Sequence, residues 1–228
     1  MRTLAHEHPI LFSGEMVRAI LENRKTQTRR VMKWVLGGDV VDHQLTNDNI
    51  LYMEHLGGGS TFRPRACPYG VSGDRLWVRE TFVLERWDDE PKPPTDRVLF
   101  HHERDLKDEY DNEYWWWPHY KATDQAPDLF YENDEMDEPQ CKWCPSIHMP
   151  RWASRIQLEI VKVRVERVQE ISQEDAKAEG VSAWRETVNG TTYIPEYSLL
   201  WDSINSKRGY TWKSNPWVWV IEFKRVPQ

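Results

Sequence analysis

The chain has 228 residues, with 30 Lys and Arg against 37 Asp and Glu, and a formal net charge of −7 at pH 7. That length allows one large domain, or a small domain with a long insertion, and either can bury a core. No apolar run approaches the roughly 20 residues of a membrane span, and residues 1–12 lack the apolar centre of a signal peptide, so we expect a cytoplasmic protein. Its 13 tryptophans, at a mean hydropathy of −0.78, suit either a small packed core or a surface that stacks on bases or sugars.

The first predicted element is a short amphipathic helix that begins at Ser13, a capping residue, and ends near Asn23. The segment ENRKTQTRRV then holds two threonines and four cationic side chains, Arg24, Lys25, Arg29 and Arg30. A lysine near a hydroxyl can act as its base if burial lowers the pKa of the ammonium group, which makes Lys25 and Thr28 candidates for an activated nucleophile. The alternative is that these cations are solvated at a helix end and satisfy its carbonyl groups.

Two loop-rich regions interrupt the predicted strands. Residues 36–65 contain LGGD and LGGGS and are expected to form a loop or hairpin excursion. Residues 85–140, the acidic insertion, hold 18 acidic and 6 basic side chains and predict a surface insertion around one aromatic-rich strand. The overall acidity of the chain therefore belongs to this one segment.

A predicted strand with a polar face lies between these regions. In RLWVRETF, residues 75–82, Leu76 and Val78 alternate with the side chains of the opposite face. That face and the residue after it are expected to form the floor of a polar pocket, with Arg75, Trp77, Arg79 and Glu80 as binding residues.

The longest predicted strand covers residues 154–168. Its apolar residues alternate in one phase through Ile160 and in the opposite phase from Val161. Such a phase change implies a bulge, or a strand that passes from one sheet to another, and bends of this kind close small barrels.

The C-terminal part of the chain predicts two helices and a closing strand. Ser172 is expected to cap the first helix with Gly180 just past its end, and Pro195 lies in the first turn of the second. Residues 215–226 predict the last strand, one face of which carries Trp217, Trp219, Ile221 and Phe223. The expected fold is therefore α+β, a compact mixed β-barrel with short flanking helices and the acidic insertion, in a single domain of residues 1–228.

Glu179 lies in the last turn of the first of these helices. The negative end of the helix dipole disfavours a carboxylate there by roughly 0.3–1 kcal/mol. A nearby cation or a catalytic role would explain its position, and pairing with Lys177 or simple exposure to solvent is the alternative.

The segment HMPRWASR places Trp152 between two arginines, Arg151 and Arg155. Guanidinium groups bind phosphates and an indole stacks on a base, so these three residues are a candidate nucleic-acid interface. Core packing of Trp152, with both arginines paired to acids, is the alternative.

Three cysteines cannot pair off evenly, so thiol or metal chemistry is the alternative to a disulfide framework. One CxxC pair, a histidine four residues later and a distant cysteine offer the ligands of a structural zinc site: Cys67, Cys141, Cys144 and His148. Three ordinary reduced thiols are the other interpretation, and no further cofactor is required.

Five segments of the chain carry a family resemblance: ILENRKTQTRR, SGDRLWVRE, PSIHMPRWASRI, ISQEDAKAEGV and WVIEFKRV. Together they resemble the ASCH domain of the PUA-like superfamily, in a form common in phages and prophages. The excursion 36–65 and the acidic insertion lie outside the resemblance. It implies a PUA-like barrel, a location in the host cytoplasm if the protein is phage-encoded, and a ligand that is a modified nucleoside or a nucleic acid, RNA rather than DNA.

The small bacterial N4-acetylcytidine amidohydrolases of that superfamily carry a Lys, Thr and Glu catalytic set with an RKTxTxR stretch. The resemblance carries this set onto Lys25, Thr28 and Glu179, with Arg24 and Arg30 as binding residues. It implies that Thr28 attacks, or activates water, at an amide carbonyl, that Lys25 is its base or holds the oxyanion, and that Glu179 moves protons or orients Lys25.

Other functions remain open at this point, because a shared fold does not establish a shared substrate. One alternative is a ribonuclease and another is an RNA- or DNA-binding module without catalysis. A third is a phage interaction protein that uses the acidic insertion as a nucleic-acid mimic.

Overall fold

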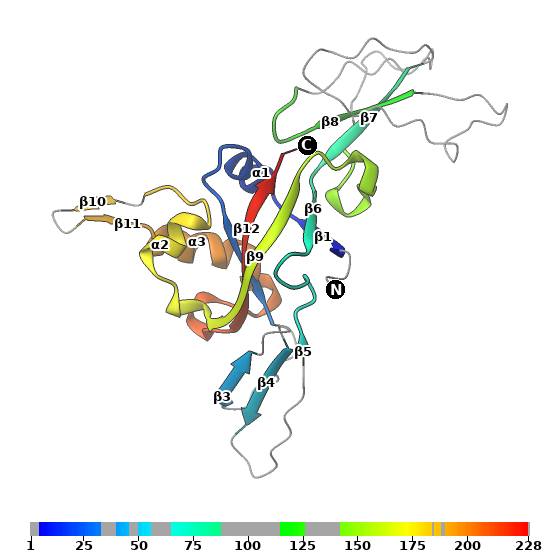
Figure 1. The fold of residues 1–228 in the computed structure, drawn as a ribbon. Coiled ribbons are helices and arrows are strands. Elements are labelled where there is room, and N and C mark those ends of the chain that lie inside the picture. The colour runs from blue at the N-terminus through cyan, green and yellow to red at the C-terminus, as the bar shows by residue number, and fades with distance from the viewer. Residues whose placement is uncertain are drawn as a thin grey trace. The chain divides into compact units, whose positions relative to one another are not determined.

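The computed structural model describes residues 5–32, 40–45, 50–55, 65–87, 115–125, 142–183, 185–187 and 190–227. It has a mixed α+β fold with few, short helices (Figure 1). The main sheet is mixed, and its five strands lie in the order β1 (Glu7–Leu11), β6 (Arg75–Arg79), β9 (Gln157–Arg167), β12 (Trp217–Val226) and β2 (Gln27–Val31). The strands in the described part of the chain do not form a closed barrel.

Three smaller sheets complete the described strands. They are β3 (Val40–Leu45), β4 (Ile50–His55) and β5 (Arg65–Ala66); β7 (Phe82–Trp87) and β8 (Trp115–Tyr120); and β10 (Arg185–Thr187) and β11 (Gly190–Thr192). The antiparallel pair β3 and β4 is the hairpin expected within residues 36–65. Strand β8 is the strand expected in the acidic insertion, most of which lies outside the described residues.

The helices are α1 (Gly14–Leu21), α2 (Gln173–Ala178) and α3 (Ile194–Asn205). Helix α2 begins as predicted, because Ser172 Oγ accepts a hydrogen bond from the Asp175 amide at 3.0 Å. Gly180 follows its end with a φ of 86°. Helix α1 stops at Leu21, slightly before the predicted end. None of the described helices is long and apolar enough to span a membrane.

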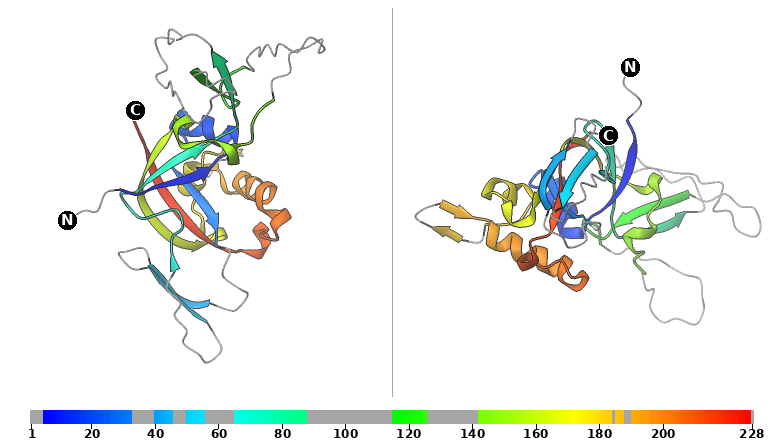
Figure 2. Two further views of the ribbon diagram at one scale, coloured as in Figure 1. Left: turned by 90° about the vertical axis from the view of Figure 1, so that its right-hand side faces the viewer. Right: turned by 90° about the horizontal axis from the view of Figure 1, so that it is seen from below.

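The chain divides into two compact units. The first unit comprises Met1–His8, Ala19–Leu76 and Leu158–Pro227, and the second comprises Pro9–Arg18 and Trp77–Gln157. In the first unit, β12 lies between β9 and β2 (Figure 2). The predicted alternation of β12 described one face only, since Val218 and Val220 on its other face are also buried.

A cluster around helices α2 and α3 covers that second face of β12 (Figure 1). Its buried members are Val168, Ile171, Ala176, Tyr197, Trp201, Val218 and Val220. Packing of this kind stabilises a short helix such as α2, which would be marginal by itself. The cluster therefore holds the C-terminal end of α2 close to strand β2.

Strand β9 changes phase as its sequence predicted. Leu158 and Ile160 are buried, and burial resumes at Val163 and Val165. Val161 departs from the expectation, because it is 47% exposed and marks the change itself. The positions between the buried valines, Arg164 and Glu166, thereby form a polar face in the first unit.

Candidate functional site

Residues 24–26 lie against the C-terminal end of α2. Three consecutive carbonyl groups accept from them, at 2.9 Å each: Ala178 from the Thr26 amide, Glu179 from Lys25 Nζ, and Gly180 from Arg24 Nη1. The last carbonyl groups of a helix have no partners within it, so these donors cap α2. The basic segment therefore satisfies helix carbonyl groups, as its simpler interpretation held. The side chains of Arg24 and Lys25 do so at the end of α2, and their backbone amides donate to the Ala19 carbonyl of α1 at 2.8 and 3.0 Å.

Lys25 and Glu179 form a buried ion pair in the same place. Lys25 Nζ lies 2.8 Å from Glu179 Oε2, and the two residues are 2% and 4% exposed. The pairing explains why a carboxylate occupies the last turn of α2 against the helix dipole. The exposed Lys177, the alternative partner, is not needed to account for it.

Arg29 holds the other oxygen of the same carboxylate. Its Nη1 lies 3.3 Å from Glu179 Oε1, while its Nη2 lies 2.8 Å from Asp175 Oδ2 and 3.0 Å from Glu166 Oε2. The Arg29 side chain is fully buried. Each carboxylate oxygen of Glu179 thus has its own cation.

Arg164 on β9 extends the cluster. It lies 2.6 Å from Asp175 Oδ2 and is also paired with Glu166 and Glu222. Alternating positive and negative groups compensate one another, as buried or half-buried charges require. Arg29 and Arg164 both pair with Asp175 and Glu166, but of these two arginines only Arg29 contacts Glu179.

Burial dominates the protonation of Lys25. It lowers the pKa of the ammonium group, and this effect exceeds the opposite effect of the Glu179 charge and hydrogen bond. Asp175 shows the reverse balance, because Arg29 and Arg164 outweigh its partial burial and lower the pKa of its carboxyl group. The first unit therefore contains a lysine that loses its proton more readily than an exposed one.

Thr28 lies on β2, where it is 3% exposed and opposite Ile221 of β12. Side chains alternate along a strand, so Thr28 and Arg30 lie on the face opposite Arg29. Within the described residues, the Thr28 hydroxyl makes no hydrogen bond to Lys25 or Glu179. The structure brings two of the three predicted catalytic residues into contact and leaves the third on the same strand without such a bond.

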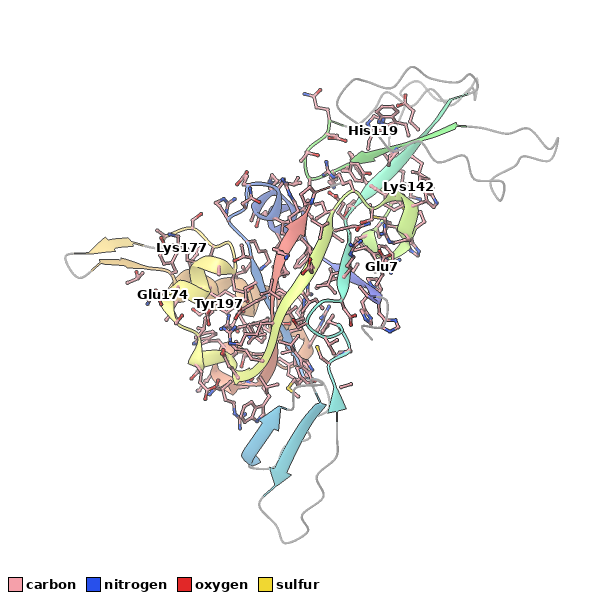
Figure 3. The ribbon with its side chains drawn as sticks, in the orientation of Figure 1. Glu7, His119, Lys142, Glu174, Lys177 and Tyr197 are labelled. Atoms are coloured by element: carbon pink, nitrogen blue, oxygen red, sulfur yellow. The ribbon has the colours of Figure 1, made fainter. Side chains whose placement is uncertain are left out.

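Two further residues near the pair, one aromatic and one basic, have pKa values that burial shifts. Tyr197 of α3, labelled in Figure 3, is buried, and burial raises its pKa well above the usual value, with a further rise from Glu179. Burial also lowers the pKa of Arg30. Tyr197 was not predicted as a site residue, because on sequence it is one apolar position of an amphipathic helix.

The sequence could have indicated the rest of the cluster only in part. Arg164 and Glu166 alternate with buried valines, a pattern that predicts a polar strand face. Nothing local identifies Arg29 as more than one of four neighbouring cations, or Asp175 as more than a residue of the capping turn.

The second unit contains another ion pair among the predicted binding residues, between a buried carboxylate and a partly exposed arginine. Glu80, 2% exposed, accepts two hydrogen bonds of 2.9 Å from Arg155. The Arg155 guanidinium lies 3.9 Å from the centre of the Tyr120 ring. Burial raises the pKa of Glu80, and this effect exceeds the opposite effect of Arg155.

Three other predicted binding residues of this unit meet at one indole. Arg79 and Arg151 lie 5.3 and 5.9 Å from the ring centre of Trp77, within the range of cation–π attraction. Arg79 also donates to the Ile147 carbonyl. Trp152 packs against the core cluster of Phe82, Tyr120, Met149 and Ala153, which is the packing alternative for that residue. Arg75 is exposed at the start of β6 in the first unit.

The predicted zinc ligands do not form a metal site within the described residues. Cys67 is buried in the first unit, where burial raises the pKa of its thiol to about 11. Cys144 and His148 lie in the second unit, where His148 is exposed and Cys144 is partly exposed. Cys141 lies outside the described residues, so the four-ligand site stays a prediction.

Comparisons of this chain with protein-family models, with curated proteins and with solved structures find no match.

Proposed function

We propose that this protein is an ASCH-type, PUA-like protein that binds a modified nucleoside or RNA and hydrolyses an acyl amide on a cytosine-like base. In this reaction water adds to the amide carbonyl, the carbon–nitrogen bond breaks, and the base amine and a carboxylic acid are released. The RNA or nucleoside ligand and the barrel-like fold are parts of the same proposal.

The observation that carries the proposal is the buried Lys25–Glu179 pair. Burial lowers the pKa of Lys25, and a general base needs a pKa near the working pH. Glu179 fixes the ammonium position at 2.8 Å and orients Lys25. Thr28, three residues along the same segment, supplies the hydroxyl that attacks the amide or positions the water.

One observation favours a second function, binding without catalysis. Lys25 and Arg24 both donate to carbonyl groups at the end of α2, which gives the basic segment a structural role. The Thr28 hydroxyl has no hydrogen bond to Lys25 among the described residues. A binding module would keep these features and hold RNA through cationic groups that face solvent.

The test is hydrolysis of N4-acetylcytidine, followed by chromatography of the cytidine released. We expect Thr28→Ala to lower kcat/KM by about 100-fold or more, the usual effect of removing a group that acts in the transition state. Substrate affinity, measured by calorimetry, should change little. Lys25→Arg should also abolish turnover, because an arginine keeps the charge but cannot act as a base at neutral pH.

Lys177→Ala is the matched control, since Lys177 is an exposed lysine of α2, and it should retain full activity. Full activity of both Thr28→Ala and Lys25→Arg would refute the mechanism. A wild-type protein that binds RNA in a salt-dependent manner, but releases no cytidine, would establish the second function instead.

A further inference from the structure

Arg29 is buried, although arginines in a basic segment usually face solvent. Its side chain is fully buried, and it contacts three carboxylates, from α2 (Glu179 and Asp175) and β9 (Glu166). It therefore links the Lys25–Glu179 pair to the neighbouring carboxylates of Asp175 and Glu166. The reaction proposed above assigns it no role.

The Glu179 carboxylate is shared between two cations, each on its own oxygen. If Lys25 lost its proton in a site without Arg29, a buried carboxylate would remain with no positive partner, which is strongly unfavourable. Arg29 removes that obstacle, because its guanidinium cannot be deprotonated in a protein and stays paired with Glu179. Asp175 and Glu166 in turn hold the guanidinium in place.

We propose that Arg29 is a positioning residue of this site, which compensates the charge of Glu179 and thereby allows Lys25 to give up its proton. The proposal rests on the proposed function only where it assigns the neutral Lys25 the role of general base. The electrostatic link between the two cations and Glu179 can be measured without any substrate.

The charged and titratable groups around the site come from every element packed against it. They are Lys25 and Arg30 near and on β2, Arg164 and Glu166 on β9, Asp175 and Glu179 in and after α2, Tyr197 on α3, and Glu222 on β12. Among these, Arg29 and Lys25 alone make direct ion pairs with Glu179 in the described structure. Removal of Arg29 should therefore raise the pKa of Lys25.

The first measurement is an NMR titration of the Lys25 side chain in protein labelled at the lysine Cε, with Lys25→Arg to assign the signal. In Arg29→Gln we expect the midpoint of Lys25 to move up by one pH unit or more. If the wild-type protein is an amidohydrolase, the acidic limb of its kcat/KM profile should move by the same amount, so that activity at a fixed pH on that limb falls about tenfold per unit.

Arg29→Lys keeps a positive charge beside Glu179 and should restore most of the midpoint. Arg164→Gln is the matched control: it removes a cation bound to Asp175 and Glu166 but not to Glu179, and it should leave the midpoint within a few tenths of a unit. Should Arg29→Gln fail to fold, Arg29→Met is a second neutral variant with a side chain of similar length, and it should raise the Lys25 midpoint while Arg164→Gln leaves it unchanged.

An unchanged Lys25 midpoint in folded Arg29→Gln, or an equal shift in Arg164→Gln, would overturn the inference. Absence of N4-acetylcytidine hydrolysis in the wild-type protein would instead refute the proposed function and leave the NMR result to decide the role of Arg29.

Discussion

At the scale of single residues, Gly180 is the position that lets the basic segment approach α2. Its φ is 86°, and a Cβ added there would lie 2.9 Å from Lys25 Cβ and 3.0 Å from Ala19 Cβ. Glycine is thus required both by the backbone conformation and by the space. The same atom contacts make Gly180 a direct neighbour of the candidate base.

Gly180→Ala should destabilise the protein and disturb the site together. We expect a loss of about 2 kcal/mol or more in the free energy of unfolding, of which roughly 1–2 kcal/mol comes from the left-handed conformation alone. Urea unfolding measures the loss. Displacement of Lys25 should also lower N4-acetylcytidine hydrolysis.

Gly209 offers a matched control for that change. Its φ is 84°, but a Cβ there would meet no atom within 4 Å. Gly209→Ala should therefore show the conformational cost without an effect on the site. Equal losses of stability and activity in the two variants would contradict a steric link between Gly180 and Lys25.

Local chemistry explains which residues could be predicted from the sequence. The capping roles of Ser172 and Gly180 depend on their neighbours in the chain, and the structure confirms both. The partners of Lys25 and Arg29 depend on how α2 packs against β2, and no short pattern contains that information. The identity of Glu179 as a site residue came from its unfavourable position in a helix and from family resemblance, not from periodicity.

At the scale of elements, Glu80 follows strand β6, and burial and ion pairing have opposite effects on the pKa of its carboxyl group. Burial raises the pKa of Glu80 despite two hydrogen bonds from Arg155. A carboxyl group whose pKa is raised on folding favours the folded state below about pH 4.5, its usual value, and this contribution is lost as the pH rises through the higher folded value.

Glu80→Gln should reveal that loss, because glutamine has a similar shape and does not titrate. We expect the unfolding free energy of the wild-type protein, relative to Glu80→Gln, to fall as the pH rises from about 4 to 7, by about 1.4 kcal/mol per unit of pKa shift. Urea titrations of both proteins at several pH values give the difference. A relative stability that rises with pH would mean that Arg155 outweighs burial.

The individual strands and helices were predicted better than the closure of the strands into a barrel. Alternation identified β6, β9 and β12, the cap at Ser172 identified α2, and the first-turn Pro195 identified α3, because these signals are local. The predicted barrel required knowledge of which strands pair at the two ends of the sheet. Alternation records which side of a strand is apolar, but it does not record its neighbour.

At the scale of the whole molecule, charge is divided between a basic site segment and the acidic insertion. Residues 88–114 alone hold 10 acidic and 4 basic side chains. Trp87 and Trp115, which flank them, are partners in the antiparallel pair β7 and β8. A short Asn-Gly turn can therefore replace residues 88–114 and keep the two strands joined.

That replacement should strengthen RNA binding at low salt, because it reduces the net charge from −7 to −1. Affinity of both proteins for a single-stranded RNA should fall with salt, and the difference between them should shrink as charges are screened. A variant that keeps residues 88–114 but carries Asn and Gln in place of their Asp and Glu distinguishes the effect of charge on RNA affinity from the effect of segment length. Weaker binding after the replacement would contradict repulsion and favour a direct role for the insertion.

The contact between residues 24–26 and the end of α2 also bears on the synthesis of the protein. Lys25 and Glu179 are 154 positions apart, and chains leave the ribosome N-terminus first. The nascent protein therefore carries the whole basic segment, and several strands, long before the partner of Lys25 exists. Until α2 emerges, Lys25 remains an ordinary solvated lysine, so a product truncated before that helix would have the motif without the site.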